Sequence, residues 1–127
     1  MPGSEYRAEL PPVFVSIVTY NSAASIIQCL EAVVAQNGYE LGKNLHITVI
    51  DNASSDHSAQ IVAGAFDSKI TIVRNDKNLG FCAGHNQAAK RFLNSNTRFL
   101  LVLNPDCALA RDSLAKLVSS IDQGQSL

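Results

Sequence analysis

The stretch VFVSIVT, at Val13–Thr19, decides the fold because it is a nearly unbroken apolar run rich in β-branched residues. Such a run is typical of a parallel strand that is buried on both faces of its sheet. The run begins directly after Pro11 and Pro12, which break regular structure. We therefore expect residues 1–12 to form a polar N-terminal extension and residues 13–127 to form one folded unit.

An amphipathic helix is predicted after this strand, over residues 24–36. Its apolar residues recur at the spacing of one helical stripe, and they are Ile26, Ile27, Leu30, Val33 and Val34. The alternation of an apolar run with an amphipathic segment then repeats. Strands are expected at residues 47–50, 70–73 and 99–103, and helices after Asp56, over about 80–93 and from about Asp112. The expected buried stripes include Phe81 and Leu93 in the third helix and Leu117 and Ile121 in the last.

Four strand–helix units in sequence predict an α/β fold with a doubly wound, mostly parallel, Rossmann-like sheet. The common strand order 3-2-1-4 places the first and fourth strands side by side. This order leaves the fourth strand, Phe99–Leu103, at an edge of the sheet, although its composition is that of a central strand. We therefore expect the chain to be the front part of a larger domain and to self-associate.

Composition excludes several classes of protein. Ten Lys and Arg against eleven Asp and Glu give a net charge of −1 without a basic stripe, which argues against a nucleic-acid partner. No apolar stretch approaches the roughly 18 residues of a membrane span, and the N-terminus lacks the features of a signal peptide. We therefore expect a cytoplasmic protein. Its three cysteines lack the spacing of a zinc site and are expected to be reduced thiols.

Polar residues follow every predicted strand, at the edge of the sheet where ligands of open α/β sheets bind. These residues are Tyr20 and Asn21 after the first strand, Asp51 and Asn52 after the second, Arg74, Asn75 and Asp76 after the third, and Asn104 and Asp106 after the fourth. An aromatic ring among carboxylates and amides suits a nucleotide. The glycine-rich phosphate loops are missing from the sequence. We therefore expect Asp106 to hold Mg²⁺ or Mn²⁺ together with the phosphates of the ligand.

Four segments in this order resemble the nucleotide-sugar-binding half of a family two glycosyltransferase of GT-A fold, and most resemble the rhamnosyltransferase-like subgroup. They are VSIVTYN (15–21), VIDNASSD (49–56), NLGFCAGHN (78–86) and LLVLNPD (100–106). The resemblance implies an inverting, metal-dependent transferase. It would move rhamnose from dTDP-rhamnose, or a hexose from a UDP-sugar, to a glycan or lipid-linked acceptor. A lipid-linked acceptor would place the protein at the inner face of the membrane.

The resemblance also implies a role for individual residues. Thr19 and Tyr20 would line the base pocket, and Asp51 would contact the base or ribose. Within NPD, which stands for the DxD motif of the family, Asn104 would lie near the ribose and Asp106 would bind the metal. The floor beside the base would be formed by Asn78, Gly80 and Asn86.

No general base is identified in the sequence. After Asp106 the only carboxylates are Asp112, interpreted as a helix cap, and Asp122, interpreted as a solvated helix residue. The missing base leaves open whether the chain is a fragment or a binding module that senses a nucleotide sugar without turnover. A receiver-like domain, in which Asp51 accepts a phosphoryl group, is a separate alternative. His85 is interpreted as a surface or hydrogen-bonded histidine rather than a catalyst.

Overall fold

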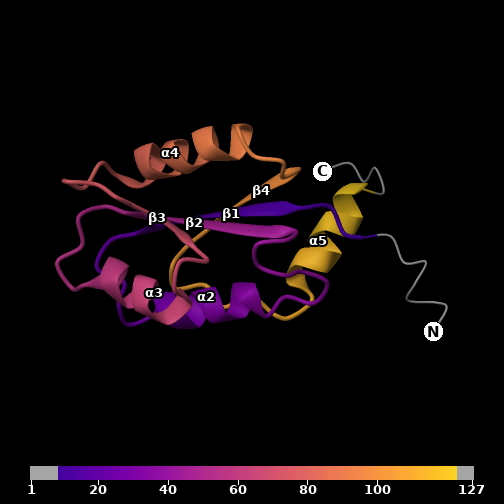
Figure 1. The fold of residues 1–127 in the computed structure, drawn as a ribbon, viewed down its shortest axis with the longest axis horizontal. Coiled ribbons are helices and arrows are strands. Elements are labelled where there is room, and N and C mark those ends of the chain that lie inside the picture. Colours follow the sequence, from indigo (N-terminus) through magenta and orange to yellow (C-terminus); the bar gives the residue numbers. More distant parts are fainter. Residues whose placement is uncertain (1–8, 123–127) are drawn as a thin grey trace.

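The computed structural model describes residues 9–122, in which strands and helices alternate along the chain (Figure 1). In chain order the elements are β1 (Val13–Thr19), α2 (Ile26–Val34), β2 (Leu45–Asp51), α3 (Ser58–Phe66), β3 (Thr71–Arg74), α4 (Phe81–Leu93), β4 (Phe99–Leu103) and α5 (Ser113–Asp122). The four predicted strand–helix units are confirmed. Of the expected N-terminal extension, residues 1–8 lie outside the described part of the chain.

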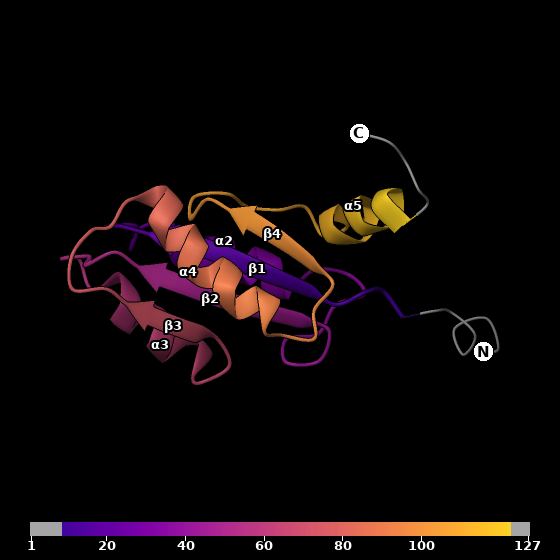
Figure 2. The ribbon, with the colours of Figure 1, turned by 90° about the horizontal axis from the view of Figure 1, so that it is seen from above.

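The sheet is parallel throughout and has the order β3-β2-β1-β4, as predicted. β1 is buried at every position because β2 and β4 flank it and helices cover both of its faces. This double coverage explains its continuous apolar sequence. All four strands point the same way (Figure 2), so their carboxyl ends lie at one edge of the sheet.

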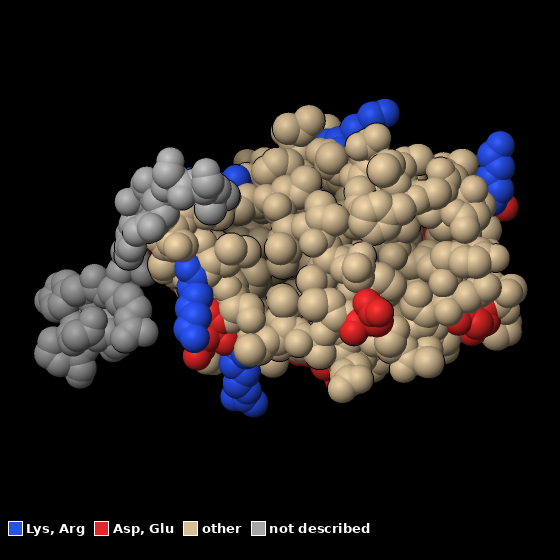
Figure 3. All heavy atoms as spheres, turned by 180° about the vertical axis from the view of Figure 1, so that it is seen from behind, with Lys and Arg blue, Asp and Glu red and all other residues tan. Residues whose placement is uncertain are grey.

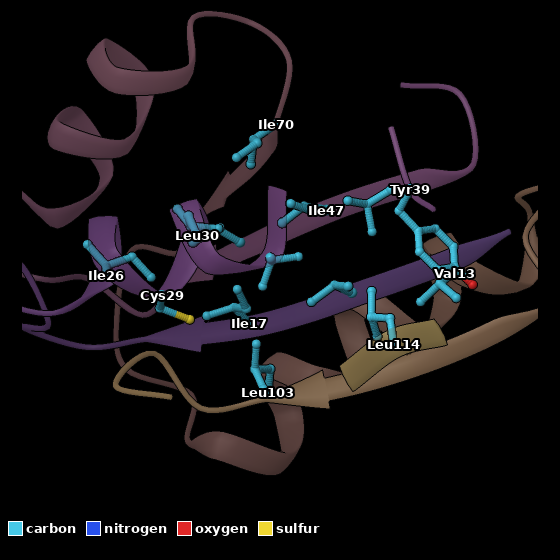
Figure 4. Close-up of a cluster of buried hydrophobic side chains, with 14 of the residues drawn as sticks. Val13, Ile17, Ile26, Cys29, Leu30, Tyr39, Ile47, Ile70, Leu103 and Leu114 are labelled. Carbon is cyan, nitrogen blue, oxygen red and sulfur yellow. The ribbon is translucent and has the colours of Figure 1, made fainter. Parts of the chain in front are cut away.

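Helices cover both faces of the sheet, which confirms the doubly wound architecture. α4 lies on one face, α2 and α3 lie on the other, and α5 lies at the end where the strands begin (Figures 1 and 2). The larger core lies on the α2 side and includes Ile17, Leu30 and Leu114 (Figure 4). A smaller core under α4 contains Phe14, Val18, Ile50 and Ala88.

The buried face of α4 differs from the predicted stripe. Phe81 and Leu93 are 53% and 78% exposed, whereas the buried residues of this helix are Gly84, His85 and Ala88. The physical reason is the close approach of the helix to β1. A Cβ at Gly84 would lie 2.8 Å from Cγ2 of Val18, so a larger residue would have to displace Val18, and glycine lets the helix turn this side toward the sheet.

The stripe of α5 is only half covered. Leu114 and Val118 are buried, as predicted, but Leu117 and Ile121 are 48% and 38% exposed. α5 packs beside the start of the sheet rather than over it (Figure 2). The buried strip of this helix is therefore narrower than the sequence pattern predicts.

β4 is an edge strand in the described part of the chain, as predicted. It pairs with β1 on one side, and no strand among residues 9–122 pairs with its other side. Val102 of this strand is 47% exposed. Charged residues of both signs are scattered over the face shown in Figure 3, without a patch of one sign. Between residues 9 and 122, no helix combines the length and apolarity needed to cross a membrane.

Candidate functional site

The parallel register brings the predicted strand-end residues to one edge. Thr19 lies opposite Asp51 in the β1–β2 pair, and Asp51 lies opposite Arg74 in the β2–β3 pair. β4 pairs with β1 through Leu103, opposite Ile17, so Asn104 and the residues after it leave the sheet at the same edge. Three of the predicted segments therefore meet where ligands of open α/β sheets bind.

Thr19 and Asp51 are buried at this edge, with 0% and 6% of their surfaces exposed. Both face the α2 side, because side chains alternate along a strand and their neighbours Ile17 and Val49 belong to the core on that side. Within the described residues, Thr19 Oγ1 and Asp51 Oδ1 have no hydrogen-bond partner. Asp51 Oδ2 accepts one long hydrogen bond, of 3.4 Å, from the backbone N–H of Ser54.

A buried carboxylate oxygen without a partner is unfavourable by about 1 to 3 kcal/mol or more. Such groups are rare in folded proteins and call for an explanation. Asp51 is not the N-cap of α3, which begins at Ser58, so a capping role does not explain it. The arrangement suits a ligand that brings N–H or O–H donors to this pair of oxygens.

Asn21 joins the loops that follow β1 and β2. Its backbone N–H donates to Oγ of Ser54 at 2.8 Å, and its side-chain oxygen accepts from the N–H of Ser55 at 2.8 Å. Asn21 has φ 51°, a left-handed conformation that asparagine tolerates. Its amide oxygen is therefore occupied within the protein, and Asn21 ties the loop after β1 to the loop after β2.

Asp56 extends this connection to the start of α3. Its carboxylate accepts from the backbone N–H of Ala23 at 2.9 Å and of Ser58 at 3.1 Å. The side-chain hydrogen bond from Ser58 is the main reason that the pKa of Asp56 lies below its ordinary value, and the N–H of Ala23 adds to this. Asp56 therefore binds the first helical N–H, which belongs to Ser58. Asp56 lies one residue before the N-cap, His57.

An amide network to which the sequence assigned no role lies on the α4 side of the edge. Asn52 is 1% exposed. It donates to the carbonyl of Gly80 at 3.1 Å and accepts from Asn75 at 2.8 Å. Asn75 and Gln87 exchange two further hydrogen bonds, of 2.8 and 2.9 Å. This network holds the ends of β2 and β3 against the start of α4. The polar residues after these strands were the only signal of it in the sequence.

The residues predicted to form the floor occupy the turn before α4 and the helix itself. Asn78 accepts a 2.9 Å hydrogen bond from the N–H of Gly80. Gly80 has φ 92° and open space where a Cβ would stand, so the turn requires glycine for its conformation rather than for room. Asn86 is exposed on α4. Tyr20 follows β1 and is 52% exposed, so its ring is available to a ligand.

Asn104 and Asp106 occupy an exposed turn after β4. The carbonyl of Asn104 accepts from the N–H of Cys107 at 3.1 Å, which closes the turn. No group of three His, Cys, Asp or Glu able to hold a metal occurs in the part of the chain that is described. A single exposed carboxylate fits the mode in which Mg²⁺ takes one or two protein carboxylates and completes its shell with ligand phosphates and water.

Neither of the remaining C-terminal carboxylates serves this edge. Asp112 accepts a 2.7 Å hydrogen bond from the side chain of Asn37, and Asp122 forms a 2.8 Å ion pair with Arg98. Asp122 is exposed on α5, as interpreted from the sequence, and the ion pair with Arg98 lies at the surface. Both residues lie at α5, at the end of the sheet where the strands begin (Figure 1).

His85 is not a surface residue: it is buried, and one of its two ring nitrogens is hydrogen-bonded. Its Nδ1 lies 2.7 Å from Oγ of Ser16, and its ring packs edge-on against Phe81. Burial lowers the pKa of His85, since it disfavours the charged imidazole. Nε2 has no partner among the described residues.

The parallel sheet and the polar edge place the chain in the class of open α/β domains, whose ligands bind beyond the carboxyl ends of the strands. The chain belongs to glycosyl transferase family 2, whose family model matches residues 14–127. This assignment argues against the receiver-like alternative. The resemblance in the sequence is confirmed at the level of the family, and the subgroup stays a prediction.

Curated relatives agree with this family. The chain is 25% identical over 114 residues to a succinoglycan biosynthesis protein, ExoO, of Rhizobium meliloti, which covers 90% of the chain and 31% of the relative. It is 33% identical over 115 residues to the glycosyltransferase AglE of Haloferax volcanii, covering 88% of the chain and 36% of the relative. The chain therefore spans about a third of the length of these relatives.

Solved structures share the fold. TarS of S. aureus, residues 1–349 in complex with UDP, superimposes with a TM-score of 0.75 at 23% identity and covers 88% of this chain and 32% of its own. A mannosyltransferase, PcManGT of Pyrobaculum calidifontis, in complex with GDP-Man and Mn²⁺, gives a TM-score of 0.72 at 25% identity and covers 84% and 31%. The fold is thus that of the N-terminal part of GT-A glycosyltransferases.

Proposed function

We propose that this chain is the donor-binding part of a glycosyltransferase that moves a sugar from a nucleotide diphosphate to a glycan or lipid-linked acceptor. The observation that carries the proposal is the buried pair of unpartnered oxygens, Thr19 Oγ1 and Asp51 Oδ1, at the carboxyl edge of the sheet. Structural neighbours in complex with UDP, UDP-GlcNAc and GDP-Man support a nucleotide-sugar ligand. The rhamnosyltransferase-like segments favour dTDP-rhamnose or a UDP-hexose as the donor.

The base and ribose would be recognised at the ends of β1 and β2. Asp51 Oδ1 and Thr19 Oγ1 would accept hydrogen bonds from a base N–H or a ribose hydroxyl, which satisfies both oxygens. The exposed ring of Tyr20 would pack on the base. In this proposal the turn at Asn78 and Gly80, together with Asn86, shapes the floor, and Asn104 lies near the ribose.

Asp106 would hold Mg²⁺ or Mn²⁺ beside the diphosphate. The bound ion would neutralise the charge that develops on the departing nucleoside diphosphate. The role of the chain is to place one carboxylate, on the turn closed by Asn104 and Cys107, at the same edge as the base site. A structural neighbour with GDP-Man and Mn²⁺ supports this combination.

The proposed reaction is an inverting displacement, in which a base takes the proton of the acceptor hydroxyl as it attacks the anomeric carbon. No residue between 9 and 122 is assigned as that base. A non-catalytic nucleotide-sugar-binding module is the second candidate, and this missing base is the observation that favours it. Turnover by a version of the chain as long as its relatives, compared with this chain, distinguishes the two. A lipid-linked acceptor would place the protein at the cytoplasmic face of the membrane.

The direct test is calorimetric binding of UDP, dTDP and GDP, each with Mn²⁺ and with EDTA. We expect one diphosphate to bind preferentially and its affinity to fall in EDTA. Adenine nucleotides serve as the control for non-specific binding. If no nucleoside diphosphate binds under any of these conditions, the proposed function is wrong.

A further inference from the structure

Two cysteines converge on a single carbonyl in the turn after β4. The thiol of Cys29, in α2, donates to the carbonyl oxygen of Asn104 at 3.5 Å. The backbone N–H of Cys107 donates to the same oxygen at 3.1 Å. The Cys29 sulfur points toward the sheet, near Ile17 (Figure 4). Cys107 packs against the apolar cluster that contains Cys29.

The two sulfur environments differ in a way that matters for oxidation. Cys29 is 1% exposed, whereas Cys107 is half-buried. Burial therefore shields Cys29 from direct oxidation, and of these two thiols Cys107 is the one that a small oxidant reaches first.

The third cysteine supplies a natural control. Cys82 is exposed in the first turn of α4. Because α4 and α2 lie on opposite faces of the sheet (Figure 1), the sheet separates Cys82 from Cys29. Oxidation of Cys82 therefore cannot lead to an intramolecular bond with Cys29 while the chain is folded.

We propose that Cys29 and Cys107 form a reversible disulfide when a hydroperoxide oxidises the protein. The peroxide transfers one oxygen to Cys107, which becomes a sulfenic acid, and water or an alcohol leaves. The Cys29 sulfur then attacks the Cys107 sulfur, so an S–S bond forms and the S–O bond breaks. The hydroxide leaves with the Cys29 proton as water. Two thiols lose two electrons in total, and a dithiol reductant restores them.

The disulfide would act on the proposed metal site, and this consequence rests on the proposed function. Asp106 directly precedes Cys107 in the chain. The Cys29 thiol would lose its hydrogen bond to the carbonyl of Asn104, and an S–S bond of about 2.05 Å would tie the turn directly to α2. Displacing groups that orient a metal ligand typically weakens metal binding by about 10 to 100-fold. We expect Mn²⁺-dependent binding of a nucleoside diphosphate to weaken in this range.

Peptide mapping tests the bond itself, whatever the protein binds. The folded chain is treated with hydrogen peroxide, its remaining thiols are alkylated, and it is digested without reductant for mass spectrometry. We expect a peptide linked through Cys29 and Cys107, with Cys82 alkylated or singly oxidised. The linked peptide should persist in Cys82→Ser, be absent in Cys107→Ser and disappear after dithiothreitol. The proposal is wrong if Cys29 is found only in its alkylated form after peroxide treatment, or if disulfide links occur only between separate chains.

Calorimetry with UDP and Mn²⁺ then tests the consequence for binding. The affinity of the oxidised chain should fall and recover with dithiothreitol, while Cys107→Ser should bind equally well before and after peroxide. If the disulfide is mapped but the affinity is unchanged, the proposed effect of the disulfide on nucleotide binding is wrong. A reduced chain that binds no nucleotide would instead contradict the proposed function and leave the mapped disulfide standing.

Discussion

Asp51 is the residue on which donor binding depends most directly. Its Oδ1 is buried without a partner, so replacement by alanine removes a ligand contact and an unfavourable burial at the same time. We expect Asp51→Ala to weaken nucleotide binding by about 1 to 3 kcal/mol while the melting temperature stays the same or rises. Calorimetry and a thermal melt measure the two effects. Asp76→Ala, at an exposed strand-end carboxylate, is the control and should change neither.

Asp106 tests the metal assignment. Asp106→Asn preserves the shape of the side chain but removes the charge that favours a divalent ion. Binding of a nucleoside diphosphate should then lose its dependence on Mn²⁺. A nucleoside without phosphates should bind to the variant as weakly as it binds to the wild type. Asp112→Asn is the matched control, since an amide oxygen can still accept the hydrogen bond from Asn37. Full Mn²⁺ dependence in Asp106→Asn would contradict the assignment.

His85 makes stability depend on pH. Burial lowers its pKa in the folded chain below the ordinary value of 6.5, so the unfolded chain binds a proton more readily than the folded chain. The free energy of unfolding should therefore fall as the pH drops below about 6.5, by at most about 1.4 kcal/mol per pH unit. Urea unfolding at pH 7.5 and 5.5 measures this. In His85→Gln the difference between the two pH values should be smaller, and an equal difference would rule out His85 as the source.

At the scale of elements, the contact of α4 with β1 depends on Gly84. A Cβ there would lie 2.8 and 3.0 Å from the two methyl groups of Val18. We expect Gly84→Ala to destabilise the protein by about 1 to 3 kcal/mol, although alanine favours a helix. Gly64→Ala in α3 is the matched control, because nothing lies within 4 Å of its Cβ position. It should stabilise by up to about 1 kcal/mol. Equal effects in urea unfolding would show that packing at Gly84 is loose.

At the scale of the whole molecule, the unpaired edge of β4 predicts self-association. The strand is apolar and Val102 is 47% exposed, and such an edge invites pairing with another chain. Sedimentation should show association that increases with concentration. Val102→Lys should reduce it, because a lysine on an edge strand opposes pairing. Thr71→Lys on the opposite edge strand, β3, should have a smaller effect. A wild-type chain that stays monomeric would contradict this prediction.

The sequence alone determined the four strand–helix units, the strand order and the edge at which the polar residues gather. The strand–helix units follow from the periodicity of apolar residues, which is a local property of the sequence. The strand order and the polar edge follow from the rules that connect parallel strands. The tertiary structure decided which side of α4 is buried, because Gly84 sets the approach of the helix to Val18. It also decided that Asp51 Oδ1 lacks a partner and that Asn52 binds Asn75. Hydrogen bonds between separate strand ends depend on distances across the sheet, and no spacing along the chain encodes those distances.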